Sequence, residues 1–135
     1  WRGYMAKCFD LSEIIGLFRK DPDFHKMGMI VSHLGVVRGS SRSATGDVMA
    51  VEVAYDHAGV KKIVSDIEML NGIVKVFVDF NEGRLRTGED ILVVAVGGDI
   101  RENVFPALES AVNRIKSEAV KKKEIFGDQE THEWE

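Results

Sequence analysis

The chain is poor in cysteine, because Cys8 is the only one among its 135 residues. An intrachain disulfide is therefore excluded, and a reducing, cytoplasmic location is expected. One cysteine and four scattered histidines show no spacing typical of a zinc or iron site, so no metal is expected. A catalytic thiol at Cys8 would need a nearby base, and an inert role is favoured.

Long apolar runs are missing as well. No segment approaches the length of a membrane span, and the first residues do not resemble a signal peptide. Neither a phosphate-binding glycine loop nor a nucleophile elbow is present. The net charge of −4 argues against a nucleic-acid surface held by bulk electrostatics. We therefore expect a protein that acts on neither membranes nor nucleic acids.

The composition that remains is that of an ordinary globular protein, with 44% hydrophobic and 30% charged residues. A chain of this length can bury a core without disulfide or metal staples. No repeat, low-complexity tract or linker divides it. The sequence predicts one domain over residues 1–135, with 1–9 and 125–135 as candidates for a peripheral place.

The hydrophobic pattern predicts three helices and four strands in the order α-β-β-α-β-β-α. Their expected ranges are helix 11–18, buried strand 28–38, strand 47–55, helix 56–70, strand 73–80, strand 91–96 and helix 101–123. Asp10 with Glu13 forms a capping box before the first helix, and Asp56 can cap the second. Short turns between neighbouring strands indicate antiparallel pairing, hence an α+β fold. The charged tail can add a short strand near Trp134.

The last predicted helix has an apolar stripe and a proline near its start. The stripe consists of Phe105, Leu108, Val112, Ile115 and Ala119. Pro106 is compatible with the helix only if it lies in the first turn.

One candidate anion site follows the first predicted strand. Gly35-Val36-Val37-Arg38-Gly39 closes the apolar run, and Ser40-Ser41-Arg42-Ser43 comes next. The planar, permanently charged fork of Arg38 suits a phosphate or a carboxylate. The alternative is a strand followed by a solvated loop.

A second candidate site lies along the last predicted helix. Lys116 and Lys123 are seven residues apart and would share a helix face beside the apolar stripe. Partial desolvation there would favour a neutral amine, which can accept a proton or attack a carbonyl. The alternative is that both lysines keep their ammonium groups in water.

Two further residues are candidates for ligand contact. Arg101, after a glycine pair and at the start of the last helix, makes an anion site or a simple cap region equally reasonable. His33, within the first strand, could titrate or contact a ligand, although a structural role is favoured.

Taken in order, these segments resemble the large, catalytic subunit of molybdopterin synthase, over about residues 10–135. Their shared order and spacing carry the resemblance, since no single motif is specific. The matching segments are Gly35-Val36-Val37-Arg38, Ala54-Tyr55, the G-x-L-x-x-G-[DE] turn of Gly83, Leu85, Gly88 and Glu89, Arg101 with Phe105, Lys116, Lys122-Lys123-Glu124, and Glu133-Trp134-Glu135.

The resemblance implies an α/β-hammerhead type of fold and a homodimer flanked by two ubiquitin-like small subunits, together a heterotetramer. The small subunit would carry a thiocarboxylate at its C-terminal Gly-Gly. The pair would transfer sulfur to cyclic pyranopterin monophosphate, forming molybdopterin in molybdenum cofactor biosynthesis. No bound cofactor is expected, because the sulfur arrives already activated on the partner.

Position by position, the resemblance also implies roles for five residues. Lys116 matches the family's essential lysine, and Lys123 matches the second lysine, or Lys122 if the gap falls otherwise. Arg38 and Arg101 match arginines that hold the anionic pterin, and Lys122 is placed with them.

Several departures from the family pattern leave two other readings open. Ile100 stands where histidine is usual, Phe80-Asn81 replaces a His-Arg pair, His33 replaces an aromatic residue, and Ala119-Val120-Lys121 replaces Pro-x-Trp. A non-catalytic relative that binds a pterin-like anion or a ubiquitin-like partner is one alternative. A small-ligand regulatory domain with the same order of elements is the other.

Overall fold

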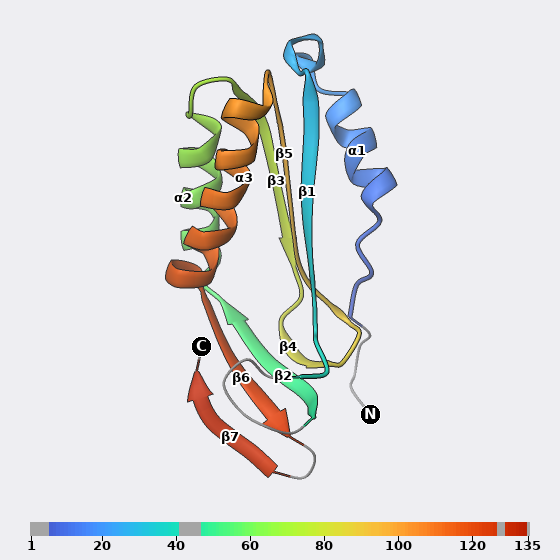
Figure 1. The fold of residues 1–135 in the computed structure, drawn as a ribbon, viewed down its shortest axis with the longest axis vertical. Helices are drawn as coiled ribbons and strands as arrows, with labels where there is room; N and C mark the ends of the chain where they lie inside the picture. Colours follow the sequence, from blue (N-terminus) through green and yellow to red (C-terminus); the bar gives the residue numbers. More distant parts are fainter. Residues whose placement is uncertain (1–5, 41–46, 127–128, 135) are drawn as a thin grey trace.

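The computed structural model describes residues 6–40, 47–126 and 129–134. It has an elongated shape, with helices on both faces of one sheet and a second sheet beyond the end of the first (Figure 1). The elements in chain order are α1 (Leu11–Arg19), the 3-10 turn η1 (Phe24–Lys26), β1 (Met29–Val36), β2 (Val48–Tyr55), α2 (His57–Glu68), β3 (Ile73–Phe80), β4 (Gly83–Arg86), β5 (Asp90–Gly98), α3 (Arg101–Arg114), the π-helical turn η2 (Ile115–Ala119), β6 (Val120–Phe126) and β7 (Gln129–Trp134).

The first sheet has the strand order β1-β5-β3, and both pairings are antiparallel. β5 is central and apolar, so its alternate side chains support two different layers. Val93 and Ala95 pack with Ile14 and Phe18 of α1 on one face. The other face joins the main core with α2 and α3. α1 lies very close to the sheet at Gly97, where an added Cβ would come within 2.9 Å of the Phe18 ring.

The second sheet has the order β4-β2-β6-β7, again antiparallel throughout. β2 and β6 pair along nearly their whole length, from Tyr55 opposite Val120 to Val48 opposite Phe126. This pairing places the segment after α3 directly beside the second strand of the chain.

Much of the predicted local structure is confirmed. The α+β class and the antiparallel pairing hold, as do the three helices and the four predicted strands. Asp10 caps α1 by accepting from Ser12 N at 2.9 Å and Glu13 N at 3.3 Å. Asp56 caps α2 by accepting from Gly59 N at 3.1 Å. The tail does add a strand, β7.

The helix predicted over 101–123 is wrong in its last part. α3 ends at Arg114, a π-helical turn follows to Ala119, and the chain then becomes strand β6. Lys116 and Lys123 therefore do not share a helix face. The backbone beyond Ala119 finds its hydrogen-bond partners on β2, and that tertiary pairing outweighs the helical propensity of a lysine-rich segment.

Smaller corrections concern packing. β1 is an edge strand and not a buried one, since Leu34 and Val36 are 38% and 44% exposed. The buried stripe of α3 includes Val104, Ala107 and Ala111, whereas Phe105 faces solvent. Pro106 is the sixth residue of α3, beyond the first turn, and is accommodated at an exposed position.

The strands divide between two sheets because β1 and β2 run apart, joined at their ends by one bridge between Ser40 and Asp47. Ser41, Arg42 and Ser43 of the predicted basic loop lie outside the described residues. Among the described helices, none has both the length and the apolar character needed to cross a membrane.

Candidate functional site

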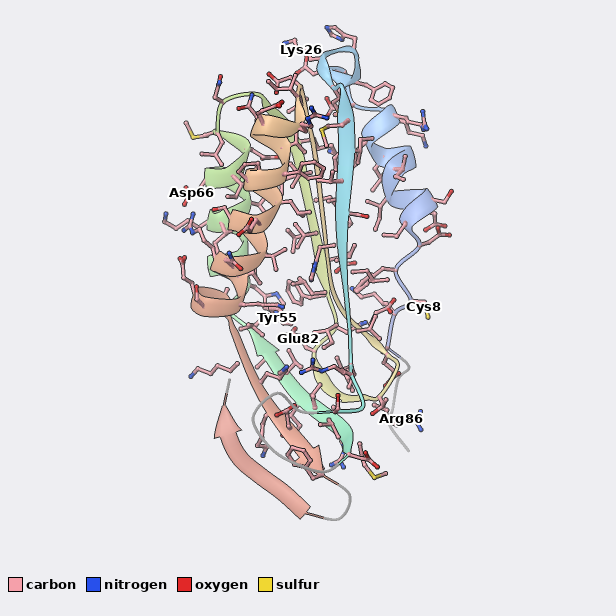
Figure 2. All side chains as sticks on the ribbon, viewed as in Figure 1. Cys8, Lys26, Tyr55, Asp66, Glu82 and Arg86 are labelled. Carbon is pink, nitrogen blue, oxygen red and sulfur yellow. The ribbon has the colours of Figure 1, made fainter. Side chains whose placement is uncertain are left out.

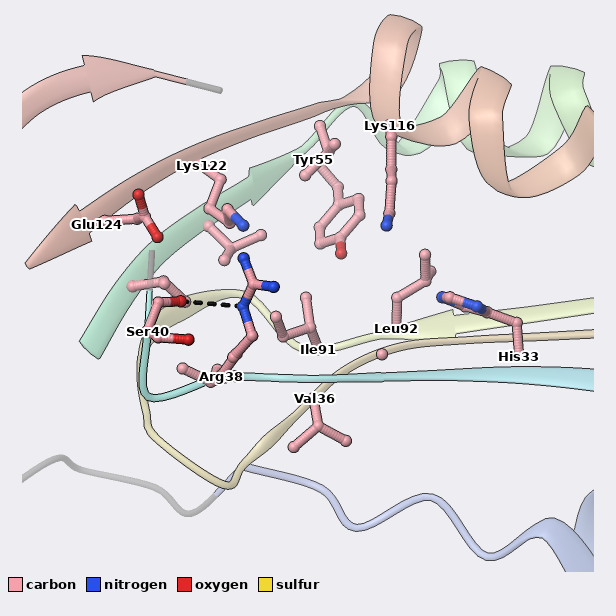
Figure 3. A pocket seen from close by; sticks show the side chains of 15 residues that line it. His33, Val36, Arg38, Ser40, Tyr55, Ile91, Leu92, Lys116, Lys122 and Glu124 are labelled. Carbon is pink, nitrogen blue, oxygen red and sulfur yellow. Dashed lines mark hydrogen bonds between the residues drawn. The ribbon is translucent and has the colours of Figure 1, made fainter. Parts of the chain in front are cut away.

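A cavity of about 410 Å³ lies where the two sheets meet. Figure 2 places Tyr55 and Glu82 at this junction, and Figure 3 shows the cavity from close by. Its volume is within the range of pockets that hold small organic ligands. It is lined by His33, Gly35, Val36, Val37, Arg38, Ser40, Val51, Val53, Tyr55, Ile91, Leu92, Lys116, Val120, Lys122 and Glu124.

Arg38 reaches the cavity from just beyond the end of β1. Both backbone polar groups of the preceding residue, Val37, form hydrogen bonds. Val37 N donates to Glu89 O at 2.9 Å, and Val37 O accepts from Gly88 N at 2.9 Å. Gly88 has φ +91°, a backbone conformation that favours glycine. The turn between β4 and β5 therefore fixes the position of the backbone from which the Arg38 side chain extends. Its Nε then donates to Ser40 O at 2.9 Å (Figure 3).

Lys116 enters the cavity from the π-helical turn η2. Irregular π turns are common at functional sites, because they re-aim side chains that a regular helix would place elsewhere. Arg114 stabilises this turn by donating from Nε to Glu118 at 2.9 Å and from Nη1 to Asp66 of α2, also at 2.9 Å. Lys116 itself is exposed, which agrees with the alternative that its ammonium group stays in water in the single chain.

Lys122 and Lys123, the two candidates for the family's second lysine, lie on opposite faces of β6. Lys122 and Glu124 line the cavity. Lys123 lies outside it, directly opposite Glu52 of β2, and its Nζ is 3.5 Å from the Glu52 carboxylate. Because strand side chains alternate, neighbouring lysines cannot share one face. The structure thus places Lys122 with Arg38 and Lys116, and leaves Lys123 out.

Arg101 is also outside the cavity. It begins α3, whereas Lys116 follows the opposite end of that helix. Its side chain is 76% exposed, with Nε 3.4 Å from Glu102 Oε2. Within one chain, contrary to expectation, Arg101 therefore does not line the same cavity as Arg38, Lys116 and Lys122.

His33 projects from β1 into the same cavity. Its Nε2 is buried, and it is the one buried side-chain nitrogen or oxygen of the described residues without a hydrogen-bond partner. Burial, and then the positive charge of Lys116, lower the pKa of His33 from its ordinary value of 6.5. The imidazole is therefore neutral at physiological pH.

Tyr55 is a cavity residue that the sequence did not single out as a site residue. Its ring stacks on Phe80 with centroids 4.1 Å apart, and its backbone N donates to Glu82 Oε2 at 3.1 Å. Burial, and then the Glu82 carboxylate, raise the pKa of its hydroxyl above the ordinary 10.0. Tyr55 therefore offers a neutral O–H. The alternation of Val51, Val53 and Tyr55 along the strand was the signal that could have found it.

The charges of the cavity favour an anion. Three basic side chains, Arg38, Lys116 and Lys122, line it together with one acid, Glu124. Arginine and lysine in a confined pocket bind phosphate and carboxylate groups and stabilise negative charge that develops in a reaction. No three His, Cys, Asp or Glu side chains of the described segments come together as metal ligands. Fold and site thus define an α+β protein with an anion-binding cavity between two antiparallel sheets.

Comparison with known proteins places the chain within a family. The family model described as MoaE protein matches residues 5–118. The chain belongs to the MoaE family.

Individual relatives agree with this assignment. The chain is 26% identical, over 125 residues, to the "Probable molybdopterin synthase" of Haloferax volcanii, covering 89% of this chain and 48% of that protein. It thus spans about half the length of the curated relative it matches. The MoaE molybdopterin biosynthesis protein of Burkholderia ambifaria has a similar structure, with a TM-score of 0.72, 26% identity, and coverage of 96% of this chain and 84% of that one.

A third likeness is to a complex of subunits 1 and 2 of the molybdopterin-converting factor from Helicobacter pylori. The TM-score is 0.67 and the identity 15%, with 90% of this chain and 82% of that chain covered. At this identity the likeness shows a shared fold.

Proposed function

We propose that this protein is the large, sulfur-transferring subunit of a molybdopterin synthase, acting in the cytoplasm as a homodimer with two small subunits. In this role it receives sulfur from a thiocarboxylate on the C-terminal glycine of a ubiquitin-like partner. It transfers that sulfur, in two rounds, to cyclic pyranopterin monophosphate. Membership of the MoaE family and the likeness to the relatives from Haloferax volcanii and Helicobacter pylori support this proposal.

The observation that carries the proposal is the convergence of Arg38, Lys116 and Lys122 on one cavity. These residues are up to 84 positions apart in the chain (122 minus 38) and come from a strand end, a π-helical turn and a second sheet. A pterin that carries a phosphate is an anion with a flat polar body. Fixed cations suit the phosphate of such a ligand, and apolar walls suit the faces of its flat ring system.

Lys116 is the residue we assign to the transfer step. Transfer from a thiocarboxylate needs an acid or base near the carbonyl and a cation to stabilise the charge that develops as sulfur leaves. Lys116 is exposed in the single chain. A partner tail laid over the cavity mouth would cover its amine, and desolvation favours the neutral form that can accept a proton. Arg38 and Lys122 would hold the phosphate.

The test is dithiolene formation by Lys116→Ala with a thiocarboxylated small subunit and cyclic pyranopterin monophosphate. We expect the initial rate to fall at least about 100-fold, because a positioned acid or base contributes roughly 10²–10⁴-fold. Lys61→Ala, which removes an exposed lysine of α2 that does not line the cavity, is the matched control and should keep wild-type activity.

Two results would contradict this assignment. Unchanged turnover by Lys116→Ala would remove Lys116 from the transfer step. Wild-type protein that binds the small subunit and the pterin but forms no dithiolene would be the non-catalytic relative instead.

A further inference from the structure

The cavity has two chemically different ends. In Figure 3, Arg38, Ser40, Lys122 and Glu124 gather at one end. At the other end, His33 and the Tyr55 hydroxyl lie with Lys116 and Leu92. The first end is dominated by charged groups. The second end combines one cation with two neutral hydrogen-bonding groups.

His33 Nε2 is the unusual atom of the second end. The imidazole leans along β1 toward Gly35, and the ideal Cβ position of Gly35 is 3.5 Å from Nε2. Both His33 and Gly35 line the cavity, so Nε2 lies directly behind the wall that these two residues form. Gly35 contributes no side chain to that wall. The nitrogen is nevertheless buried and has no hydrogen-bond partner.

A purely structural role does not explain this arrangement. A buried polar atom without a partner destabilises a fold, and such atoms are rare in native proteins. A phenylalanine would fill the same space without that penalty. A rotation of the imidazole toward the cavity would present this neutral ring nitrogen to a bound molecule, as donor or acceptor according to its tautomer.

We propose that His33 is a specificity-determining residue whose Nε2 forms a hydrogen bond with the uncharged heterocyclic part of the ligand. The ligand's phosphate then lies at the other end, against Arg38 and Lys122. This inference rests on the proposed function for its substrate class, a phosphorylated pterin. A pterin ring edge carries both N–H donors and nitrogen or oxygen acceptors, so either tautomer of His33 finds a partner.

The test compares two probes on three proteins by isothermal titration calorimetry. Inorganic phosphate probes the cationic end alone, and neopterin monophosphate probes both ends. The proteins are the wild type, His33→Phe, which keeps an aromatic ring but removes the nitrogen, and His33→Gln, whose amide places polar atoms near the position of Nε2.

We expect the wild type to bind neopterin monophosphate more tightly than phosphate. His33→Phe should lose about five- to tenfold of that preference, as for one hydrogen bond, with phosphate affinity within about twofold. His33→Gln should recover part of the preference. His33→Phe should also melt at a higher temperature than the wild type, because it removes a buried unpaired polar atom.

The other outcomes separate the two proposals. A wild-type preference that His33→Phe leaves unchanged, or an equal loss for both probes, overturns the role of His33 and leaves the proposed function standing. A wild type that binds the pterin phosphate no better than phosphate overturns the pterin assignment, and with it this inference.

Discussion

At the residue scale, the arrangement of the basic side chains is decided by strand alternation. Lys122 and Lys123 are neighbours in the chain, yet only Lys122 lines the cavity. Lys123 pairs with Glu52 across the β2–β6 ladder, and its side chain is 12% exposed. Its long apolar stem is therefore covered by the packing of the second sheet, and the catalytic role that the resemblance implies for Lys123 stays a prediction.

This difference gives a paired test of ligand binding. Lys122→Ala should weaken phosphate binding about tenfold, because a charge-assisted hydrogen bond contributes more than a neutral one. Lys123→Ala should leave phosphate affinity within about twofold and lower the free energy of unfolding by about 1 kcal/mol, through lost packing of the stem. Calorimetric titration and urea unfolding measure the two quantities. Equal weakening of phosphate binding by both substitutions would contradict the assigned faces.

At the element scale, the junction between α3 and β6 determines how Lys116 is presented. The π-helical turn η2 contains Lys116, and the i,i+4 ion pair of Arg114 with Glu118 spans most of this turn. Arg114 also contacts Asp66, which ties the turn to α2. One guanidinium thus links two helices and the segment that carries the proposed reacting amine.

Arg114→Ala tests this link. We expect kcat to fall about three- to tenfold with little change in phosphate affinity, because Lys116 is positioned less well while Arg38 and Lys122 remain. The Lys61→Ala variant again serves as the control. A kcat equal to that of the wild type would show that the turn holds its shape without the ion pairs.

The same variant should have a different acid response. Hydrogen bonds from Arg114 lower the pKa of Asp66 and of Glu118 below their ordinary 3.8 and 4.5. Their contribution to stability is therefore present above those ordinary values and is lost as the pH falls through the lowered ones. Urea unfolding at pH 7 and at pH 3 should show a smaller loss of stability for Arg114→Ala than for the wild type. An equal loss would mean that these contacts add nothing measurable in solution.

At the scale of the whole molecule, the cavity exists because two sheets meet. β1 and β5 supply one wall, β2 and β6 supply the other, and η2 adds Lys116 at one side (Figures 1 and 3). Side chains from sequence positions as far apart as His33 and Glu124 thus line one cavity. Arg101 is the exception, since α3 holds it away from Lys116. The single domain over residues 1–135 stays a prediction.

The proposed assembly can be tested directly. Light scattering after size-exclusion chromatography should show a dimer of this chain, and a complex of two copies with two small subunits after mixing. A monomer that binds no small subunit would contradict the proposed assembly. Cavity variants such as Lys122→Ala serve as folded controls, and they should assemble normally if the cavity is a ligand site and not the main contact surface.

Prediction from the sequence was most successful where local chemistry decides. Asp10 and Asp56 cap helices where their side chains can accept from the first turn, and β3 begins and ends where expected. Prediction failed after Arg114, because the pattern of residues 115–126 is compatible with helix and strand alike. The outcome there depends on a partner strand that lies about 70 residues earlier in the chain.

The sequence by itself determined the helix caps, the periodicity of the main elements, the α+β class, and the set of basic residues available to a site. These follow from hydrogen bonds and burial within short segments. Only the tertiary structure decided which lysine faces the cavity, that Arg101 lies apart, and that His33 carries a buried nitrogen without a partner. Those outcomes depend on which strands pair and in which register, and pairing between distant segments is set by the packing of the whole chain.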